Sequence, residues 1–188
     1  MSNHVKSATI NIFANDVVVY ASHSDIDVLR QKLQESINSI SSWYTTNKLA
    51  LSIEKCNSMV INHNLTQAPP EISLLLDGQT LKQLKHVRYL GVTIDEKLKW
   101  DRHVSDIVKR VSFATKGLCR LRENLAIDIL IDIYTDTIIP VMDYASTLWG
   151  HASCSAINDI HSLENRIART ILNKLQDRTV DGDRLYVL

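Results

Sequence analysis

Residues 9–21 read TINIFANDVVVYA, two short β-rich runs on either side of the polar pair Asn15-Asp16. β-Branched residues around an Asn-containing turn predict a tight β-hairpin with this pair at its tip. An amphipathic helix is expected next, beginning at Ser24 with Asp27 as its capping-box partner. Its apolar face recurs every three or four residues at Ile26, Leu29, Leu33, Ile37, Ile40 and Trp43/Tyr44. The chain is therefore expected to open with a hairpin and one long helix.

Short strands are expected to follow this helix. The pair Asp77-Gly78 after residues 72–76 favours a turn with positive φ and predicts a second hairpin. Other extended segments are expected at residues 49–51, 58–62 and 86–95, the last of which (HVRYLGVTID) reads as a single strand.

Helices are expected to dominate beyond Trp100. Asp101 is a plausible N-cap, and an apolar stripe follows it at Val104, Ile107, Val108, Val111, Ala114, Leu118 and Leu121. At about 100° per residue, the opposite side of this helix carries Arg102, Lys109, Lys116 and Arg120. Two more helices are expected over residues 126–139, ending near Pro140, and over residues 155–175. The predicted fold class is α+β, divided into residues 1–99 and residues 100–188.

The 188 residues are one domain's worth of chain, and 45% of them are apolar, as in ordinary globular proteins. The formal net charge of zero hides an uneven distribution, with −2 over residues 1–81, +7 over residues 82–122 and −5 over residues 123–188. A basic middle segment between acidic ends indicates a polyanionic partner. Chance clustering of solvated charges explains the same pattern, so charge alone leaves both interpretations open.

Cysteine spacing and hydropathy exclude other classes. The three cysteines, Cys56, Cys119 and Cys154, lie far apart without a zinc-binding spacing. No signal peptide and no apolar run of about 18 residues is found. We therefore expect an intracellular protein, nuclear or cytoplasmic, that has no membrane partner. Its oligomeric state is left open.

The first hairpin has two interpretations. A carboxylate held on rigid strands suits a hard cation such as Mg²⁺, and here that carboxylate is Asp16. A two-metal centre needs more than one carboxylate, however, because two cations must be held. Asn15-Asp16 is also ordinary turn chemistry. The hairpin by itself favours the turn interpretation.

Four sequence stretches, taken in their order along the chain, favour the metal-site interpretation of this hairpin over the ordinary turn. They read FANDVVVYAS, ISSWYTTNKLALSIEKCNSMVI, VRYLGVTIDEKLKWDRHV and IIPVMDYASTLWG. Together they resemble the C-terminal part of the reverse transcriptases of non-LTR (LINE-type) retrotransposons, over about residues 10–172. The resemblance implies a partial polymerase palm over residues 1–99, including a primer-grip-like strand, and a helical thumb over residues 100–188. It also implies RNA-directed DNA polymerisation, a Mg²⁺ cofactor, an RNA template and a DNA primer.

The resemblance also implies roles for individual residues. Asn15 and Asp16 fall at the two metal-binding carboxylate positions, and Lys55 falls at a lysine near the phosphates of the incoming nucleotide. Arg88, Tyr89, Leu90 and Gly91 match the hairpin that grips the primer end. Arg102, Lys109, Lys116 and Arg120 would follow the template–primer phosphates. The ordinary alternatives are a solvated lysine at position 55 and core aromatic residues at Tyr89 and Trp149.

Two departures from the family pattern lead us to expect no activity from this chain. The family's principal metal-binding Asp is replaced by Asn15, whose amide has no charge and binds hard cations weakly. The family's fingers and its earlier palm strand, with another catalytic Asp, are expected to lie upstream. The alternative function is a non-catalytic nucleic-acid-binding module that uses residues 82–122. A chain without any function is the third possibility.

Overall fold

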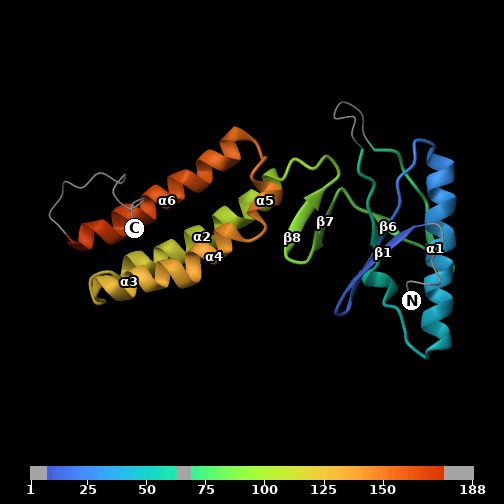
Figure 1. The fold of residues 1–188 in the computed structure, drawn as a ribbon, viewed down its shortest axis with the longest axis horizontal. Helices are drawn as coiled ribbons and strands as arrows, with labels where there is room; N and C mark the ends of the chain where they lie inside the picture. The colour runs from blue at the N-terminus through green and yellow to red at the C-terminus, as the bar shows by residue number, and fades with distance from the viewer. Residues whose placement is uncertain (1–7, 63–68, 176–188) are drawn as a thin grey trace. The chain divides into compact units, whose positions relative to one another are not determined.

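A computed structural model describes residues 8–62 and 69–175, and these residues mix helices with small sheets. The chain separates into two compact units, residues 1–98 and residues 99–188. The first unit holds the strands and one long helix, and the second is helical (Figure 1). This mixture is compatible with the predicted α+β class. No described helix is both long and apolar enough to cross a bilayer.

The predicted first hairpin is confirmed. Strand β1 (Thr9–Phe13) pairs antiparallel with β2 (Asp16–Tyr20), from Thr9 opposite Tyr20 to Phe13 opposite Asp16. Helix α1 (Ile26–Thr46) follows and contacts β2. Its N-cap is Asp25, whose carboxylate accepts hydrogen bonds from the N–H groups of Asp27 and Val28 at 2.8 and 3.2 Å. The prediction of Ser24 as the cap was therefore wrong by one residue.

The core of the first unit lies under α1. Ile72, Leu74, Leu76 and Leu81 are buried there, with Leu29, Leu33 and Ile37 of α1 packed against them. Gln34 fastens α1 to this layer through two 2.8 Å hydrogen bonds, one to the N–H and one to the carbonyl of Leu75. Strands β4 (Leu75–Leu76) and β5 (Gln79–Thr80) form the predicted second hairpin, with Asp77 at φ 49° and Gly78 at φ 80°.

Three of the predicted extended segments differ from the structure. Residues 49–51 form no strand, and the short 3₁₀ helix η2 (Ile53–Lys55) follows them. Only β3 (Asn57–Ser58) is extended in the next segment, where it pairs in parallel with β6 (Lys82–Gln83). Residues 86–95 form a hairpin of β7 (His86–Tyr89) and β8 (Val92–Asp95) instead of one strand. The reason is that Leu90 and Gly91 both adopt positive φ, which reverses the chain.

The second unit is built on α2 (Asp101–Leu121) and α6 (Cys154–Leu175), which lie side by side (Figure 1). The N-cap of α2 is Trp100, in a left-handed conformation, and not the predicted Asp101. Asp101 is the first helical residue, and its carboxylate accepts a hydrogen bond from the N–H of Ser153. Hydrogen bonds from the Ser153 side chain and backbone hold the pKa of Asp101 below its usual value.

The helical segment around Pro140 also departs from prediction, because it continues past the proline. Helix α3 (Ile127–Ile133) is followed by the π-helix η3 (Tyr134–Ile138) and then by α4 (Ile139–Asp143). Proline is tolerated in the first turn of a helix, where its missing N–H has no partner to lose. The π turn places Pro140 in that first turn, so the chain stays helical. Short helix α5 (Ser146–Trp149) leads to α6.

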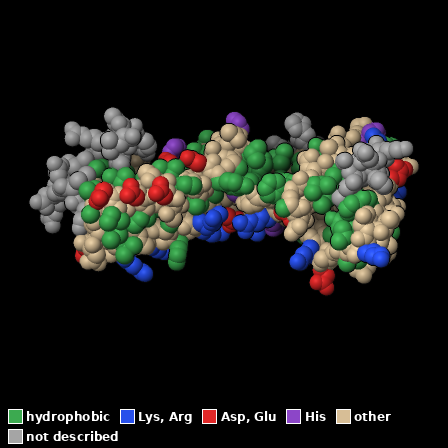
Figure 2. All heavy atoms as spheres, turned by 60° about the horizontal axis from the view of Figure 1, so that its bottom comes forward, with side chains coloured by type: hydrophobic (Ala, Val, Ile, Leu, Met, Phe, Trp, Pro, Cys, Tyr) green, Lys and Arg blue, Asp and Glu red, His purple; other side chains and the backbone are tan. Residues whose placement is uncertain are grey.

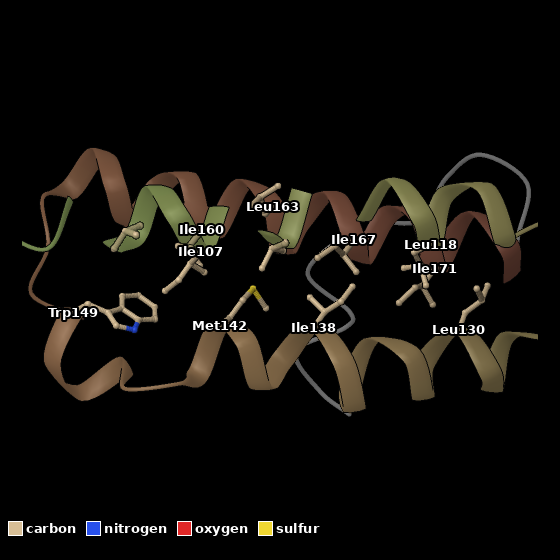
Figure 3. Packing of buried hydrophobic residues seen from close by; sticks show 12 residues of the cluster. Ile107, Leu118, Leu130, Ile138, Met142, Trp149, Ile160, Leu163, Ile167 and Ile171 are labelled. Atoms are coloured by element: carbon tan, nitrogen blue, oxygen red, sulfur yellow. The ribbon is translucent and has the colours of Figure 1, made fainter. Parts of the chain in front are cut away.

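Figure 3 shows the core of the second unit as a continuous row of side chains between these helices. Leu130, Ile138 and Met142 point from α3, η3 and α4 toward Ile107 and Leu118 of α2 and toward residues of α6. Leu130 and Ile167 are fully buried. Trp149 closes one end, and its indole N–H donates to the Tyr144 carbonyl at 2.9 Å. Trp149 is buried, so the structure supports the alternative interpretation of this residue as part of the core.

Candidate nucleic-acid interface

The first hairpin presents Asn15 and Asp16 to solvent. Ala14 and Asn15 form its two-residue turn, with Ala14 at φ 50°, and Asp16 is the first residue of β2, opposite Phe13. Both Asn15 and Asp16 are exposed. The predicted tip therefore consists of Ala14 and Asn15, while Asp16 projects from the strand beside it. The hairpin holds the backbone of Asp16 on a rigid pair of strands, as a ligand position requires.

The residues around Asp16 do not fit a two-metal centre. Mg²⁺ prefers near-octahedral oxygen coordination, and two-metal phosphoryl transfer needs several carboxylates around the reacting phosphate. Over residues 8–62 and 69–175, no group of three or more His, Cys, Asp and Glu side chains converges. Asn15 contributes an uncharged amide at the adjoining position. The described residues therefore do not surround Asp16 with the set of ligating side chains that a two-metal centre requires.

Lys55 is the last residue of η2 and its side chain is exposed. Its backbone N–H donates to the Ser52 carbonyl at 3.0 Å, which closes the 3₁₀ turn. Lys55 and Asp16 both belong to the first unit, and no hydrogen bond or ion pair joins their side chains. The structure therefore does not bring these two predicted catalytic residues into direct contact.

The four predicted primer-grip residues form one end of the β7–β8 hairpin. Arg88 is exposed opposite Thr93, and Tyr89 is half-buried opposite Val92. Leu90 (φ 46°) and Gly91 (φ 82°) make the turn between them. Gly91 occupies a left-handed turn position, which glycine adopts without strain.

Helix α2 separates an apolar face from a basic face. Of the predicted apolar stripe, Val104, Ile107, Val111 and Leu118 are buried, whereas Leu121 is 44% exposed. His103 and Thr115 are also buried on this side, which hydrophobic periodicity did not predict. On the opposite face the four predicted basic side chains are all exposed: Arg102, Lys109, Lys116 and Arg120. The structure therefore presents these four residues to solvent along a single helix.

Two exposed residues of this helix were not among the binding residues predicted from the sequence. Arg110 and Phe113 are both exposed, and Phe113 is 81% exposed, the largest fraction among the exposed large hydrophobic residues described. The spacing could have revealed them, since Phe113 lies four residues after Lys109 and three before Lys116. Both also line a shallow groove of about 430 Å³ between α2 and the η3–α4 segment.

The charges around this groove are weakly paired within the described chain. Figure 2 shows some red carboxylates apart from the blue Lys and Arg side chains and others between them. Asp106, one turn before Arg110, lies 3.6 Å from Lys109, and both side chains are largely exposed. Such a surface ion pair contributes little and is screened by salt. The basic face therefore keeps most of its positive charge available to an anion.

The chain is similar in sequence to proteins encoded by mobile elements. It is 28% identical over 167 residues to the RNA-directed DNA polymerase from mobile element jockey of Drosophila melanogaster, a match that covers 86% of this chain. The jockey protein of Drosophila funebris is 25% identical over the same length. The probable RNA-directed DNA polymerase from transposon X-element of Drosophila melanogaster is 27% identical over 163 residues. No protein-family profile and no solved structure matches the chain significantly.

The matched region is a small part of each relative. The chain spans 18% of the length of the jockey and X-element proteins. The match covers most of this chain, including both compact units. The chain is thus homologous to a segment of the RNA-directed DNA polymerases of non-LTR retrotransposons, as its sequence motifs indicated.

Proposed function

We propose that this chain is a polymerase segment that does not catalyse nucleotide transfer by itself. Descent from an RNA-directed DNA polymerase implies Mg²⁺-dependent addition of nucleotides to a primer 3′-OH. The observation that supports a loss of this activity is the single carboxylate at the hairpin. Asp16 stands beside the amide of Asn15, and the described residues hold no cluster of three ligating side chains. One carboxylate holds two cations poorly, because each needs several hard oxygen ligands.

A primer-extension assay tests this proposal. The purified 188-residue chain is incubated with an annealed RNA template and DNA primer, the four deoxynucleotides, and either Mg²⁺ or Mn²⁺. We expect no extension product, while an active reverse transcriptase extends the same primer in parallel. Template-dependent synthesis that co-purifies with the chain would contradict the proposal.

The resemblance also supports roles in holding nucleic acid. In this proposal Arg88, Tyr89, Leu90 and Gly91, at the end of the β7–β8 hairpin, contact the primer strand. Lys55 contributes a positive charge toward nucleotide phosphates. The two charged residues of this set, Arg88 and Lys55, are exposed, so both side chains can reach a phosphate group. These roles need no metal, so they are compatible with a chain that has lost the chemistry.

The second candidate function is nucleic-acid binding by α2 without catalysis. The observation that favours it is the exposure of Arg102, Lys109, Lys116 and Arg120 on one helical face. Regularly spaced cations along a helix suit a polyanion, because each contact with a phosphate releases condensed counterions. The +7 charge of residues 82–122 adds long-range attraction to the same partner.

Salt dependence distinguishes this function from adventitious association. Four phosphate contacts predict a slope of roughly −3 to −4 when the logarithm of the association constant is plotted against that of salt concentration. Replacing all four residues by Gln is expected to weaken binding and flatten this slope. The matched control is a double replacement of Arg166 and Arg169, which are exposed on α6. Binding that does not depend on salt, or is unaffected by the four replacements, would argue against the proposal.

A further inference from the structure

The exposed ring of Phe113 occupies an unusual position on α2. Single exposed apolar residues are common and need no function. Phe113 differs because its neighbours on the helix surface are Lys109 and Arg110 on one side and Lys116 and Gly117 on the other. Three cations and a glycine therefore surround an aromatic ring that is 81% exposed.

The surroundings of Phe113 leave room for a flat ligand. Aromatic side chains on helices lean toward the N-terminus, so this ring extends toward the turn of Lys109 and Arg110. On its other side Gly117 has no side chain, and a Cβ added there would meet nothing within 4 Å. The adjoining groove is lined by Lys109, Arg110 and Phe113 of α2 and by Ile138 and Val141 across from them, and its volume of about 430 Å³ is within the range of small-molecule sites.

We propose that Phe113 stacks on an unpaired nucleobase, while the cations around it contact the phosphates on either side. This proposal rests on the nucleic-acid-binding function of α2 and specifies its ligand as single-stranded. The argument comes from charge and shape together. An apolar groove alone would suit many partners, but the cations at its rim select an anionic one. A nucleic-acid strand combines flat apolar bases with regularly spaced negative charges.

An unpaired strand fits this surface better than a duplex does. In a duplex the bases are already stacked on one another, and their faces are hidden from a ring that stands on a helix surface. In a single strand each base has a free π-face, and stacking on an aromatic side chain occurs with any base. Phe113 therefore contributes to single-strand binding, whereas Lys109, Arg110 and Lys116 contribute to both forms.

The test compares binding of a labelled oligothymidylate of about 16 nucleotides with binding of a duplex of matched length, by fluorescence anisotropy over a range of salt concentrations. Phe113→Ala is expected to weaken single-strand binding about tenfold without changing the salt slope, because slope counts phosphates. Duplex binding is expected to change less than about twofold. Phe113→Trp is expected to retain single-strand binding and to show added tryptophan quenching on saturation, since the indole ring also stacks.

Folding does not confound these variants. Phe113 is exposed, and Ala is the strongest helix former, so Phe113→Ala should melt at or above the temperature of the unchanged chain. Ile129→Ala is the matched control, because Ile129 is another exposed apolar residue of the same unit, on α3, and is 43% exposed. It is expected to leave binding to both probes unchanged.

The possible outcomes distinguish failure of the stacking proposal from failure of nucleic-acid binding by α2. If Lys109→Gln with Arg110→Gln weakens binding while Phe113→Ala does not, α2 binds nucleic acid through charge and the stacking proposal is wrong. If the unchanged chain binds neither probe in a salt-dependent way, the binding function of α2 itself fails. If Phe113→Ala instead abolishes self-association measured by sedimentation, and nucleic acid does not bind, the groove belongs to a second copy of the chain.

Discussion

The carboxylate of Asp101, the first residue of α2, accepts a hydrogen bond at 3.1 Å from the backbone N–H of Ser153, the residue before α6. Ser153 in turn caps α6, because its hydroxyl accepts from the N–H of Ala156 at 3.3 Å. One charged side chain therefore links the beginnings of the two longest helices of the second unit. Neither partner contributes to the apolar core, so this link acts independently of hydrophobic packing.

Removing this link is expected to destabilise the second unit. Asp101→Ala deletes the acceptor and should lower the free energy of unfolding by about 1 kcal/mol at pH 7. Urea unfolding followed by the fluorescence of Trp100 and Trp149 measures the change. Asp132→Ala, which removes an exposed carboxylate within α3, is the control and should change stability by less than about 0.5 kcal/mol.

The contribution of Asp101 should also depend on pH. Hydrogen bonds from Ser153 lower the pKa of the folded-state carboxyl below the ordinary value of 3.8. The stabilisation is therefore present above pH 3.8 and is lost as the pH falls through the folded-state pKa. The stability difference between Asp101→Ala and the unchanged chain should shrink on acidification below pH 3.8. An equal difference at pH 7 and at strongly acidic pH would contradict this assignment.

Leu130 and Ile129 are adjacent in α3 but face opposite environments. Leu130 has no exposed surface, whereas Ile129 is 43% exposed. Leu130→Ala should cost about 2–5 kcal/mol, because it removes buried methyl groups and leaves a cavity. Ile129→Ala should cost less than about 1 kcal/mol. The two variants are compared by urea unfolding, and equal losses would show that the register of α3 is wrong.

Two glycines should respond in opposite directions to alanine. Gly78 has φ 80° in the β4–β5 turn, and its added Cβ would meet nothing within 4 Å, so only backbone strain opposes the substitution. Gly78→Ala should therefore destabilise the first unit by about 1 kcal/mol. Gly117 lies inside α2, where Gly117→Ala should stabilise the second unit by about 0.5–1 kcal/mol. Trp43 fluorescence reports on the first unit and Trp149 on the second, and a shared sign would contradict the prediction.

Alanine substitutions at the two residues before α1 should affect stability differently, because only Asp25 caps the helix. Asp25→Ala should lower stability by about 1 kcal/mol, because the N–H groups of Asp27 and Val28 lose their acceptor. Ser24→Ala should have little effect, since the Ser24 side chain makes no capping bond. Amide hydrogen exchange in the first turn of α1 measures both variants. Greater loss of protection with Ser24→Ala would support the sequence-based cap instead.

Restoring the carboxylate pair is not expected to restore catalysis. Asn15→Asp creates two adjacent acidic residues at the hairpin, but the described residues of the unchanged chain hold no group of three or more ligating side chains that the new carboxylate would complete into a two-metal centre. We expect no detectable primer extension with Mg²⁺ or Mn²⁺. Appearance of template-dependent synthesis in Asn15→Asp, and its absence in the matched Asn15→Ala, would show that one carboxylate was all that the chain lacked.

Short-range patterns were enough to predict several elements. The alternation around Asn15 gave the first hairpin, the pair Asp77-Gly78 gave the second, and the three- and four-residue spacing gave the faces of α1 and α2. These features depend on turn chemistry and on periodicities within about 20 residues. The mobile-element family was likewise visible in four local motifs, and homology to the jockey and X-element polymerases agrees with it. The assignment of the two units as palm and thumb remains a prediction.

Contacts between distant residues decided the rest. The parallel pairing of Asn57 with Lys82 and the bond between Asp101 and Ser153 join positions that no local pattern relates. The π turn before Pro140 likewise keeps α3 to α4 helical where a local rule predicts an end. The groove beside Phe113 exists only because η3 and α4 pack near α2. The sequence by itself determined which side chains share a helical face, because the backbone repeat fixes that spacing. Only tertiary structure decided which of these faces are covered, because burial depends on the partner that packs against them.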